Sequence, residues 1–464
     1  NILKAFGNQS LYEYTISDGQ NKTGDNAKFV RFFWEVPKFE VGKECKWFFY
    51  AKGGGFRKWY GNIIDVVNWS EESRKHYKKD HVSRIIPEYL WYLKGITWGL
   101  ITSNIPSFRV LPENATFDVG GSSIFFKDYE HYEYYLGLLN SKVFLKIVQL
   151  LNPTLNFQVR DIRSMPIILE NTNNISVMSN QNVLLSKTDW DSFETSWDFE
   201  RHPLVIDSNH YSKISDAFEN WTVIAEERFD QLRANEEELN RIFIDIYGLQ
   251  DELTPEVEEK DVTVRKAEVE RDVRSFLSYL VGVIFGRYRL DKPGLAFAGG
   301  EFNLDEYGTY KPDKDNIIPI TAEHYFEDDI ASKITELVAI IYGKDALNEN
   351  LQFIATHLGM KESETAEDTI RRYFMKDFYK DHLKIYQKRP IYWQFSSGKK
   401  GAFKGLMYLH RYDKYTLARI RTDYVLKLTT TLNQLIEHAQ VIIDGNISAK
   451  EVARARKERE AYEA

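Results

Sequence analysis

The chain has 464 residues and a formal net charge of −8, with 43% hydrophobic and 28% charged residues. Such a length exceeds one ordinary hydrophobic core and predicts a folded protein of about two to four domains. The single cysteine, Cys45, excludes an internal disulfide framework and a cysteine-cluster zinc site, and no apolar run reaches the roughly 18 residues needed to cross a membrane. We therefore expect a cytoplasmic protein.

The negative net charge hides two basic regions. Residues 1–170 and 371–427 contain more Lys and Arg than Asp and Glu, whereas residues 171–370 are strongly acidic. Basic regions of this kind indicate contact with a polyanion. The histidines are scattered without a His-Glu-x-x-His motif, so no metal site is expected.

Residues 1–170 are predicted to form mostly strands and turns. Short β-branched and aromatic runs, separated by Gly, Asn, Asp and Pro, predict strands at 29–34, 47–50, 63–69, 97–101, 107–111 and 123–126. Apolar residues at helical spacing predict one helix over 131–151, which ends before Pro153. This segment is expected to be an α+β domain rich in β-structure.

The most distinctive stretch of this segment is the loop Tyr50–Asn62. Three glycines, Gly53 to Gly55, precede cations that alternate with aromatic residues. Glycines allow backbone N–H groups to approach an anion, while cations and aromatic rings suit phosphates and bases. A nucleic-acid-facing loop is one interpretation. A hairpin turn with core aromatics and solvated cations is the other.

Residues 171–210 are polar, rich in Asn and Ser, and show no sustained hydrophobic period, which predicts a linker. The stretch Asp189–Glu200 within it combines paired carboxylates with aromatic residues. An acid/base site is one interpretation of this stretch. A linker held to the surface by its aromatic side chains is favoured.

The remainder of the chain is predicted to be mainly helical. Residues 211–360 read as a helical spacer that begins with a long helix over 212–247, on the order of 50 Å in length. Further helices are expected at 266–288, 322–342, 348–358 and 364–386. Residues 361–464 read as a basic C-terminal domain with a hairpin, 391–395 and 403–409, and a final helix. Its interleaved cations and aromatics suit nucleic acid or a solvated surface.

No catalytic motif is found in the sequence. It contains no phosphate-binding loop, no Gly-x-Ser-x-Gly elbow and no Gly-x-Gly-x-x-Gly dinucleotide turn. Asn152-Pro153-Thr154-Leu155 shares only two residues with the Asn-Pro-Pro-Tyr motif of amino-methyltransferases, which needs a second proline and an aromatic ring. We therefore expect this chain to bind no cofactor of its own.

Several stretches in one order carry a resemblance to a known family. They are 23–34, 47–62, 117–123, 151–159, 161–167, 191–203, 376–382 and 386–393. These stretches resemble PglX, the adenine-specific DNA methyltransferases of bacteriophage exclusion (BREX) defence systems. The likeness covers almost the whole chain, which makes it more specific than any single motif.

The resemblance implies that catalysis and target recognition belong to different domains. A Rossmann-like catalytic domain, with the S-adenosylmethionine site and the Asn-Pro-Pro-Tyr motif, would precede this chain, which begins with Asn1. Residues 1–170 would be the target recognition domain, and the chain alone would be inactive. The implied reaction, methyl transfer to N6 of adenine, requires the base to be flipped out of the duplex.

Double-stranded DNA is the partner that this interpretation implies. In the glycine loop, the cations expected to contact phosphates are Lys52, Arg57 and Lys58. Two further residues, Tyr60 and Asn62, are expected either to pack the loop or to contact DNA. Further candidates able to donate to base edges or phosphates are Arg109, Asn156, Gln158 and Arg160. The expected backbone contacts in the C-terminal domain are Lys399, Lys400, Lys404, Arg411 and Arg419.

Two other classes of function stay open. A protein-interaction scaffold would use the acidic middle segment to dock other BREX proteins or a phage DNA mimic, with the basic regions binding acidic partners. A stand-alone hydrolase would use the carboxylates between Asp189 and Glu200. Loss of activity on removing those carboxylates would be required of the hydrolase.

Overall fold

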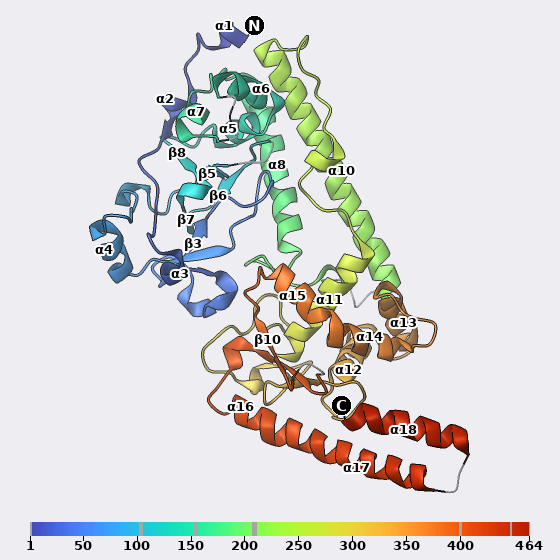
Figure 1. Cartoon of the computed structure of the whole chain (residues 1–464). Coiled ribbons are helices and arrows are strands. Elements are labelled where there is room, and N and C mark those ends of the chain that lie inside the picture. Colours follow the sequence, from blue (N-terminus) through green and yellow to red (C-terminus); the bar gives the residue numbers. More distant parts are fainter. Residues whose placement is uncertain are drawn as a thin grey trace. The chain divides into compact units, whose positions relative to one another are not determined.

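Three small sheets are spread over the part of the chain that the structure describes (Figure 1). This computed structural model describes residues 2–101, 105–152, 154, 156–206, 211–398, 401–445 and 448–463. It mixes these sheets with many helices, so the α+β, multidomain class is confirmed. The first unit comprises residues 1–200 and 219–268, and the second comprises 201–218 and 269–464. These borders differ from the predicted ones at 170, 210 and 360.

The first unit contains two four-stranded sheets and the helices around them. Its strands are β1 (Thr15–Ile16), β2 (Val30–Phe32), β3 (Trp47–Ala51), β4 (Asp65–Asn68), β5 (Gly95–Trp98), β6 (Phe108–Leu111), β7 (Ala115–Phe117) and β8 (Ser123–Phe126). Its helices are α1 (Ile2–Ala5), α2 (Leu11–Tyr14), α3 (Asn26–Phe29), α4 (Glu71–Lys79), α5 (Tyr132–Leu139), α6 (Lys142–Leu151), α7 (Val159–Arg163), α8 (Thr172–Asp191) and most of α10 (Ile214–Tyr247).

The two sheets of the first unit differ in topology. One has the antiparallel order β1-β8-β5-β6. The other has the order β2-β4-β3-β7, in which β3 and β7 pair in parallel. Strands β5, β6 and β8 are buried along their whole length, because helices α5, α6, α8 and α10 share one hydrophobic core with them. The first unit is therefore closed by helices that are distant in sequence from its strands.

Several predicted segments differ from the structure, among them the helix expected over 364–386, which divides at Asp377. The helix expected over 131–151 divides at Ser141, whose Oγ accepts the Phe144 N–H at 3.2 Å and caps α6. Most of the first half of the expected linker 171–210 is instead helix α8. Its buried face includes polar residues such as Ser179 and Asn182, so its hydrophobic period is weak. Helices α8 and α10 lie side by side (Figure 1), with Asn235 Nδ2 donating to Asn182 Oδ1 at 2.9 Å.

The second unit is mostly helical. Its helices are α9 (Pro203–Ile206), α11 (Val269–Ile284), α12 (Ile330–Tyr342), α13 (Leu347–His357), α14 (Ala366–Lys376), α15 (Phe378–Ile385), α16 (Thr416–Arg419), α17 (Leu426–Asp444) and α18 (Ala449–Glu463). The predicted hairpin is confirmed as β10 (Tyr392–Ser396) and β11 (Lys404–Tyr408), which pairs on its other side with β9 (Ile318–Ile320). Within the described ranges, no helix has both the length and the apolar composition of a membrane span.

Candidate nucleic-acid interface

Gly53 of the Tyr50–Asn62 loop is required by close backbone packing. Gly53 has a φ of +87°, and a Cβ there would lie 2.6 Å from the carbonyl oxygen of Gly120. On the facing segment, a Cβ on Gly121 would lie 2.3 Å from the carbonyl oxygen of Ala51. The two glycine-containing segments therefore pack backbone against backbone, which explains these glycines without an anion.

Arg57 is a buried structural cation. Its Nη2 lies 3.0 Å from Asp189 Oδ2, and its guanidinium also donates to the carbonyl oxygens of Ser186 and Thr263. Asp189 is fully buried and also accepts a hydrogen bond from Arg265 Nη2 at 3.2 Å. Arg228 Nη1 forms an ion pair with Asp189 Oδ1 at 3.7 Å, without a hydrogen bond. We call these three arginines and Asp189 the arginine cluster.

The arginine cluster keeps its carboxylate ionised. Burial by itself would raise the pKa of Asp189, but the charges of Arg265 and Arg57 and hydrogen bonds from Arg265 hold that pKa below its ordinary value. The prediction that Arg57 contacts phosphates therefore does not match this structure, since the residue is only 7% exposed and its guanidinium is hydrogen-bonded inside the first unit.

Lys58 and Arg109 are buried in the same way. Lys58 forms an ion pair with Glu236 of α10, whose second oxygen accepts the Trp59 indole N–H at 2.6 Å. Arg109 is 1% exposed and donates to the carbonyl oxygens of Arg57 and Gly53. Burial, followed by the charge of Arg57, lowers the pKa of Arg109 to about 10. Neither side chain is placed to reach DNA, which corrects both predictions.

The remaining predicted residues of the glycine loop are only partly exposed. Lys52 lies near Asp65, whose pKa burial raises to about 6 in spite of that cation. Tyr60 lies beneath the Lys187 ammonium, 5.0 Å from its ring centre, and burial raises its pKa. Asn62 closes the loop by donating to the Gly55 carbonyl at 2.8 Å. The loop is thus a turn with core aromatics, as the second interpretation held, but its main cations are paired instead of solvated.

The predicted contacts of the second unit are engaged within that unit. Lys404 donates to the Met375 carbonyl at 2.6 Å. Arg411 donates to the carbonyls of Phe285 and Asp313, with its guanidinium 3.7 Å from the centre of the Phe302 ring, and burial lowers its pKa. Arg419 pairs with Asp413 at 2.9 Å. Lys399 and Lys400 lie outside the described residues.

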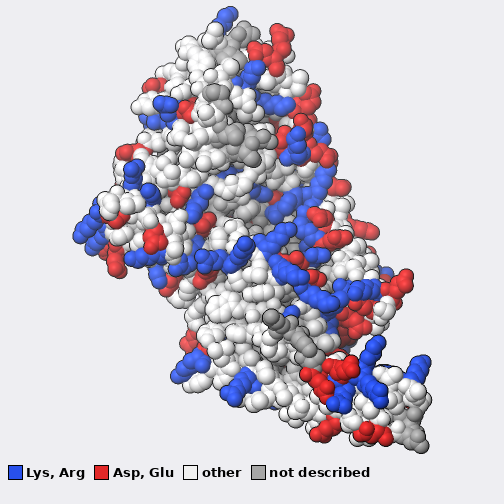
Figure 2. All heavy atoms as spheres, viewed as in Figure 1, with Lys and Arg blue, Asp and Glu red and all other residues white. Residues whose placement is uncertain are grey.

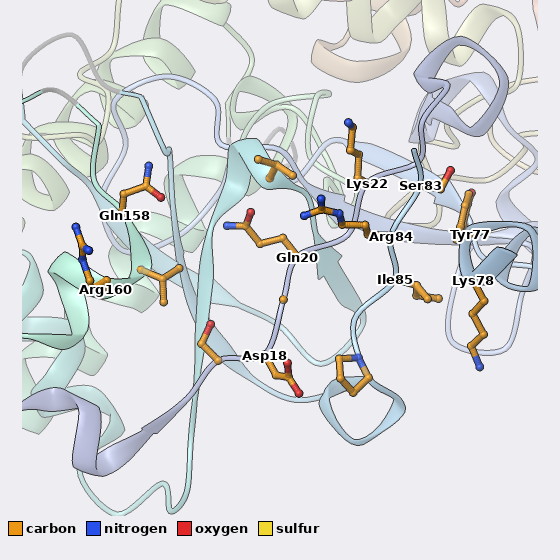
Figure 3. Close-up of a pocket in the computed structure, with 15 residues that line it drawn as sticks. Asp18, Gln20, Lys22, Tyr77, Lys78, Ser83, Arg84, Ile85, Gln158 and Arg160 are labelled. Atoms are coloured by element: carbon orange, nitrogen blue, oxygen red, sulfur yellow. The ribbon is translucent and has the colours of Figure 1, made fainter. Parts of the chain in front are cut away.

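Gln158 and Arg160, in contrast, line an open groove of about 970 Å³ in the first unit (Figure 3). Its lining residues are Ser17, Asp18, Gly19, Gln20, Lys22, Tyr77, Lys78, Ser83, Arg84, Ile85, Pro87, Val119, Gln158, Val159 and Arg160. Gln158 and Arg160 lie on one side, and Lys22 and Arg84 on the other, with Gln20 between them (Figure 3). Four cations and one carboxylate thus surround the groove.

Backbone pairing fixes the Lys22 side of the groove. The main chains of Lys22 and Arg84 exchange two hydrogen bonds, of 2.9 and 2.8 Å. The adjacent Asn21 is buried, and its amide donates to Thr116 Oγ1 and the Phe117 carbonyl while accepting the Ile86 N–H. The segments that carry Lys22 and Arg84 are therefore held together over strand β7, although the two residues are far apart in sequence.

The groove cations are exposed and weakly neutralised. Among the described residues, no carboxylate forms an ion pair with Lys22 or Arg84, and both side chains are exposed. Arg160 reaches only Asp161, at 3.8 Å, while Lys78 pairs with Glu88 at 2.7 Å. Figure 2 shows Lys and Arg side chains over α4, the helix that contributes Lys78, together with some Asp and Glu side chains. The groove therefore presents positive charge to solvent.

The Asn156 side of the groove is held by its own hydrogen bonds. Asn152 Nδ2 donates to the Asn156 carbonyl at 2.9 Å and to Asp161 Oδ2 at 2.7 Å. Gln158 Nε2 donates to Asn156 Oδ1 at 3.1 Å. Of the predicted residues, the structure thus brings Asn156, Gln158 and Arg160 together and separates them from the glycine loop.

Sequence reasoning missed the other half of the groove. Gln20, Lys22, Lys78 and Arg84 lie on short polar segments and one exposed helix end, with neither glycines nor a hydrophobic period to distinguish them. The bridge between Lys22 and Arg84 and the hydrogen bond from the Ile86 N–H to Asn21 bring the segments together, and no sequence motif predicts these contacts. In the described residues, no group of three or more His, Cys, Asp or Glu side chains could hold a metal ion.

Comparison of the sequence with known proteins identifies two relatives. No protein-family model matches the chain. It is 42% identical over 424 residues, 87% of its length, to the adenine-specific methyltransferase PglX of Lacticaseibacillus casei, and 34% identical over 476 aligned positions to the adenine-specific methyltransferase BrxX of Escherichia coli. The chain spans 35% and 39% of the length of these two proteins. The chain is therefore homologous to a segment that makes up somewhat more than a third of each of these two adenine-specific methyltransferases, PglX and BrxX.

Proposed function

We propose that the groove of the first unit binds double-stranded DNA and that this chain is the target recognition part of a site-specific adenine-N6 methyltransferase in BREX anti-phage defence. The observation that carries the proposal is the exposed, weakly neutralised set of Lys22, Arg84 and Arg160 around one groove. The homology to proteins named adenine-specific methyltransferases supports a DNA ligand over other polyanions.

The groove combines two kinds of DNA-binding group. Lys and Arg side chains neutralise phosphates and release counterions, which contributes affinity without regard to sequence. The amides of Gln20 and Gln158 can exchange hydrogen bonds with base edges, which contributes sequence preference. A groove with both kinds of group is suited to recognising a duplex site.

Methyl transfer itself is assigned to sequence outside this chain. The proteins PglX and BrxX extend well beyond the matched region. In this proposal their remaining part binds S-adenosylmethionine and receives the flipped adenine, while the groove selects the site. The chain studied alone would then bind DNA without methylating it.

The triple variant Lys22→Ala/Arg84→Ala/Arg160→Ala tests the proposal. Duplex binding by this chain is measured by fluorescence anisotropy over a salt series, with a pool of random-sequence duplexes. Each lost phosphate contact lowers the slope of log affinity against log salt by about 0.9, so the slope should fall by roughly 2 to 3. Affinity near 100 mM salt should fall on the order of 10-fold to 100-fold.

A control of equal charge change uses exposed lysines outside the groove, Lys43→Ala/Lys75→Ala/Lys127→Ala. Lys75 lies on the same helix as Lys78. This control should change the salt slope far less than the groove triple does. Equal effects of the two triples, or no effect of the groove triple, would overturn the proposal.

A further inference from the structure

We propose that Gln158 reads one adenine of the target site and that Asn156 holds the Gln158 amide in the reading orientation. The inference rests on the proposed function of the groove. Gln158 is exposed on the groove wall beside Arg160 (Figure 3). A side chain that reads a base must be exposed in this way and must also be held in one orientation.

The contact with Asn156 sets the orientation of the Gln158 amide. Gln158 Nε2 donates to Asn156 Oδ1 at 3.1 Å. A glutamine amide has two N–H donors and one carbonyl oxygen, so this contact uses one donor. One N–H and Oε1 remain for a ligand. They match the adenine edge in the major groove, where N7 accepts a hydrogen bond and the N6 amino group donates one.

The backbone around Gln158 is fixed on both sides. The Gln158 N–H donates to Asp161 Oδ2 at 3.2 Å, and the same oxygen accepts Asn152 Nδ2. The preceding residue, Phe157, is buried, and its carbonyl accepts the Trp98 indole N–H at 2.9 Å. The Gln158 side chain therefore extends from an anchored segment, which limits the entropy lost when it binds a base.

Gln20, the other glutamine of the groove, is placed differently. It is half-buried, and its Nε2 donates to Ser122 Oγ at 3.2 Å. Gln158 is the more exposed of the two and lies two residues from the Arg160 cation. A phosphate contact by Arg160 would fix the position of the duplex while Gln158 contacts a base edge.

Selection of duplexes from a random-sequence pool tests this reading. The wild-type chain should enrich sites with adenine at one fixed position by roughly 10-fold or more over other bases. Gln158→Ala should abolish that preference and leave affinity for the unselected pool within about 3-fold, because the phosphate contacts remain. Asn156→Ala should weaken the same preference without shifting its position. Gln250→Ala, an exposed glutamine outside the groove, should leave the preference unchanged.

Replacement of the selected adenine by 7-deazaadenine gives a sharper result. The analogue lacks the N7 acceptor, so it should reduce wild-type affinity about as much as Gln158→Ala does and should have no further effect on that variant. A Gln158→Ala chain that keeps its adenine preference, or a wild-type chain without any base preference, would overturn the inference. A wild-type chain that binds no duplex at all, or a groove triple variant that binds duplexes as tightly as the wild type, would instead overturn the proposed function.

Discussion

Two sets of cations in the first unit show how different roles follow from the same residue types. Arg57, Lys58 and Arg109 are buried and bonded to carboxylates or backbone carbonyls. Lys22 and Arg84 are exposed on a groove. The sequence composition favours the first set as DNA contacts, because glycines and aromatic residues surround it. The burial of the first set leaves only the second set with charges that a ligand in solvent can reach.

The difference also lies in what each set organises. Arg57 joins the glycine loop to α8 and Lys58 joins it to α10, while Arg109 of β6 donates to carbonyls of the loop itself. The groove cations are positioned through their main chains, which leaves their charged ends to solvent. We therefore expect substitutions in the buried set to change folding stability and substitutions in the exposed set to change binding.

The largest effect is expected from Asp189→Asn. The substitution leaves the three arginines around Asp189 without their shared carboxylate, and two of them, Arg57 and Arg228, are nearly fully buried. Removing one partner from a buried charge network costs about 3–5 kcal/mol. The free energy of unfolding of the first unit, measured by urea titration, should fall by that amount.

Glu71→Gln provides the control for Asp189→Asn. Glu71 is exposed and pairs with Lys75 on α4, so its loss should change the unfolding free energy far less than the loss of the buried Asp189 carboxylate does. If Asp189→Asn lowered the free energy of unfolding no more than this control does, the buried cations would contribute no more to folding stability than the exposed ones. The comparison between the two sets would then fail.

A second, smaller effect is expected in the second unit, where the carboxylates of Asp313, Asp315 and Asp328 interact with one another. The Tyr424 hydroxyl lies within hydrogen-bond distance of both Asp315 and Asp328, at 2.9 and 2.6 Å. Burial, followed by the charge of Asp315, raises the pKa of Asp313 to about 7. The folded chain therefore binds this proton more tightly than the unfolded chain, in which an aspartate has a pKa of about 3.9.

The resulting stability is fully present below about pH 4 and is lost as pH rises toward 7. Between pH 5 and pH 8, the unfolding free energy of the second unit should fall by about 2–3 kcal/mol. Asp313→Asn should remove this dependence, and Asp345→Asn, at an exposed site, should retain it. Hydrogen exchange of the β10–β11 hairpin at several pH values measures the change, and a flat wild-type profile would contradict the prediction.

The smallest stability effect is expected from the groove triple variant described above. Because Lys22, Arg84 and Arg160 are exposed, their replacement by alanine should change the free energy of unfolding by less than about 0.5 kcal/mol per site. Urea titration of the same preparation used for binding checks this. A strongly destabilised triple would mean that the groove cations also support the fold, and the two sets would no longer be distinct.

Local patterns were enough to predict many elements. Strands β3, β6 and β8, the long helix α10 and the β10–β11 hairpin follow from β-branched runs, helical periodicity and turn residues. Helix α8 was missed because Ser179, Asn182 and Asp189 are buried on its inner face, where the period method expects apolar residues. Buried polar residues satisfied by tertiary contacts carry no local signal.

The site was predicted on one side only. Asn156, Gln158 and Arg160 lie in one continuous segment, so the sequence could propose them together, and their contact with DNA stays a prediction. Lys22 and Arg84 meet through a backbone bridge across the fold, which depends on pairing that a sequence does not display. For the glycine loop, the missing information was the partner carboxylates, Asp189 and Glu236, which lie more than a hundred residues further along the chain.

The contact between Arg57 and Thr263, separated by 206 residues, also sets an order of events during synthesis. At roughly 5–20 residues per second, a ribosome needs on the order of 10–40 s to extend the chain from one residue to the other. Asp189 of α8 and Glu236 of α10 are made earlier, but until residue 263 is added the glycine loop lacks its partner at Thr263. The first unit therefore cannot mature strand by strand, and its final closure must wait for residues that follow α10.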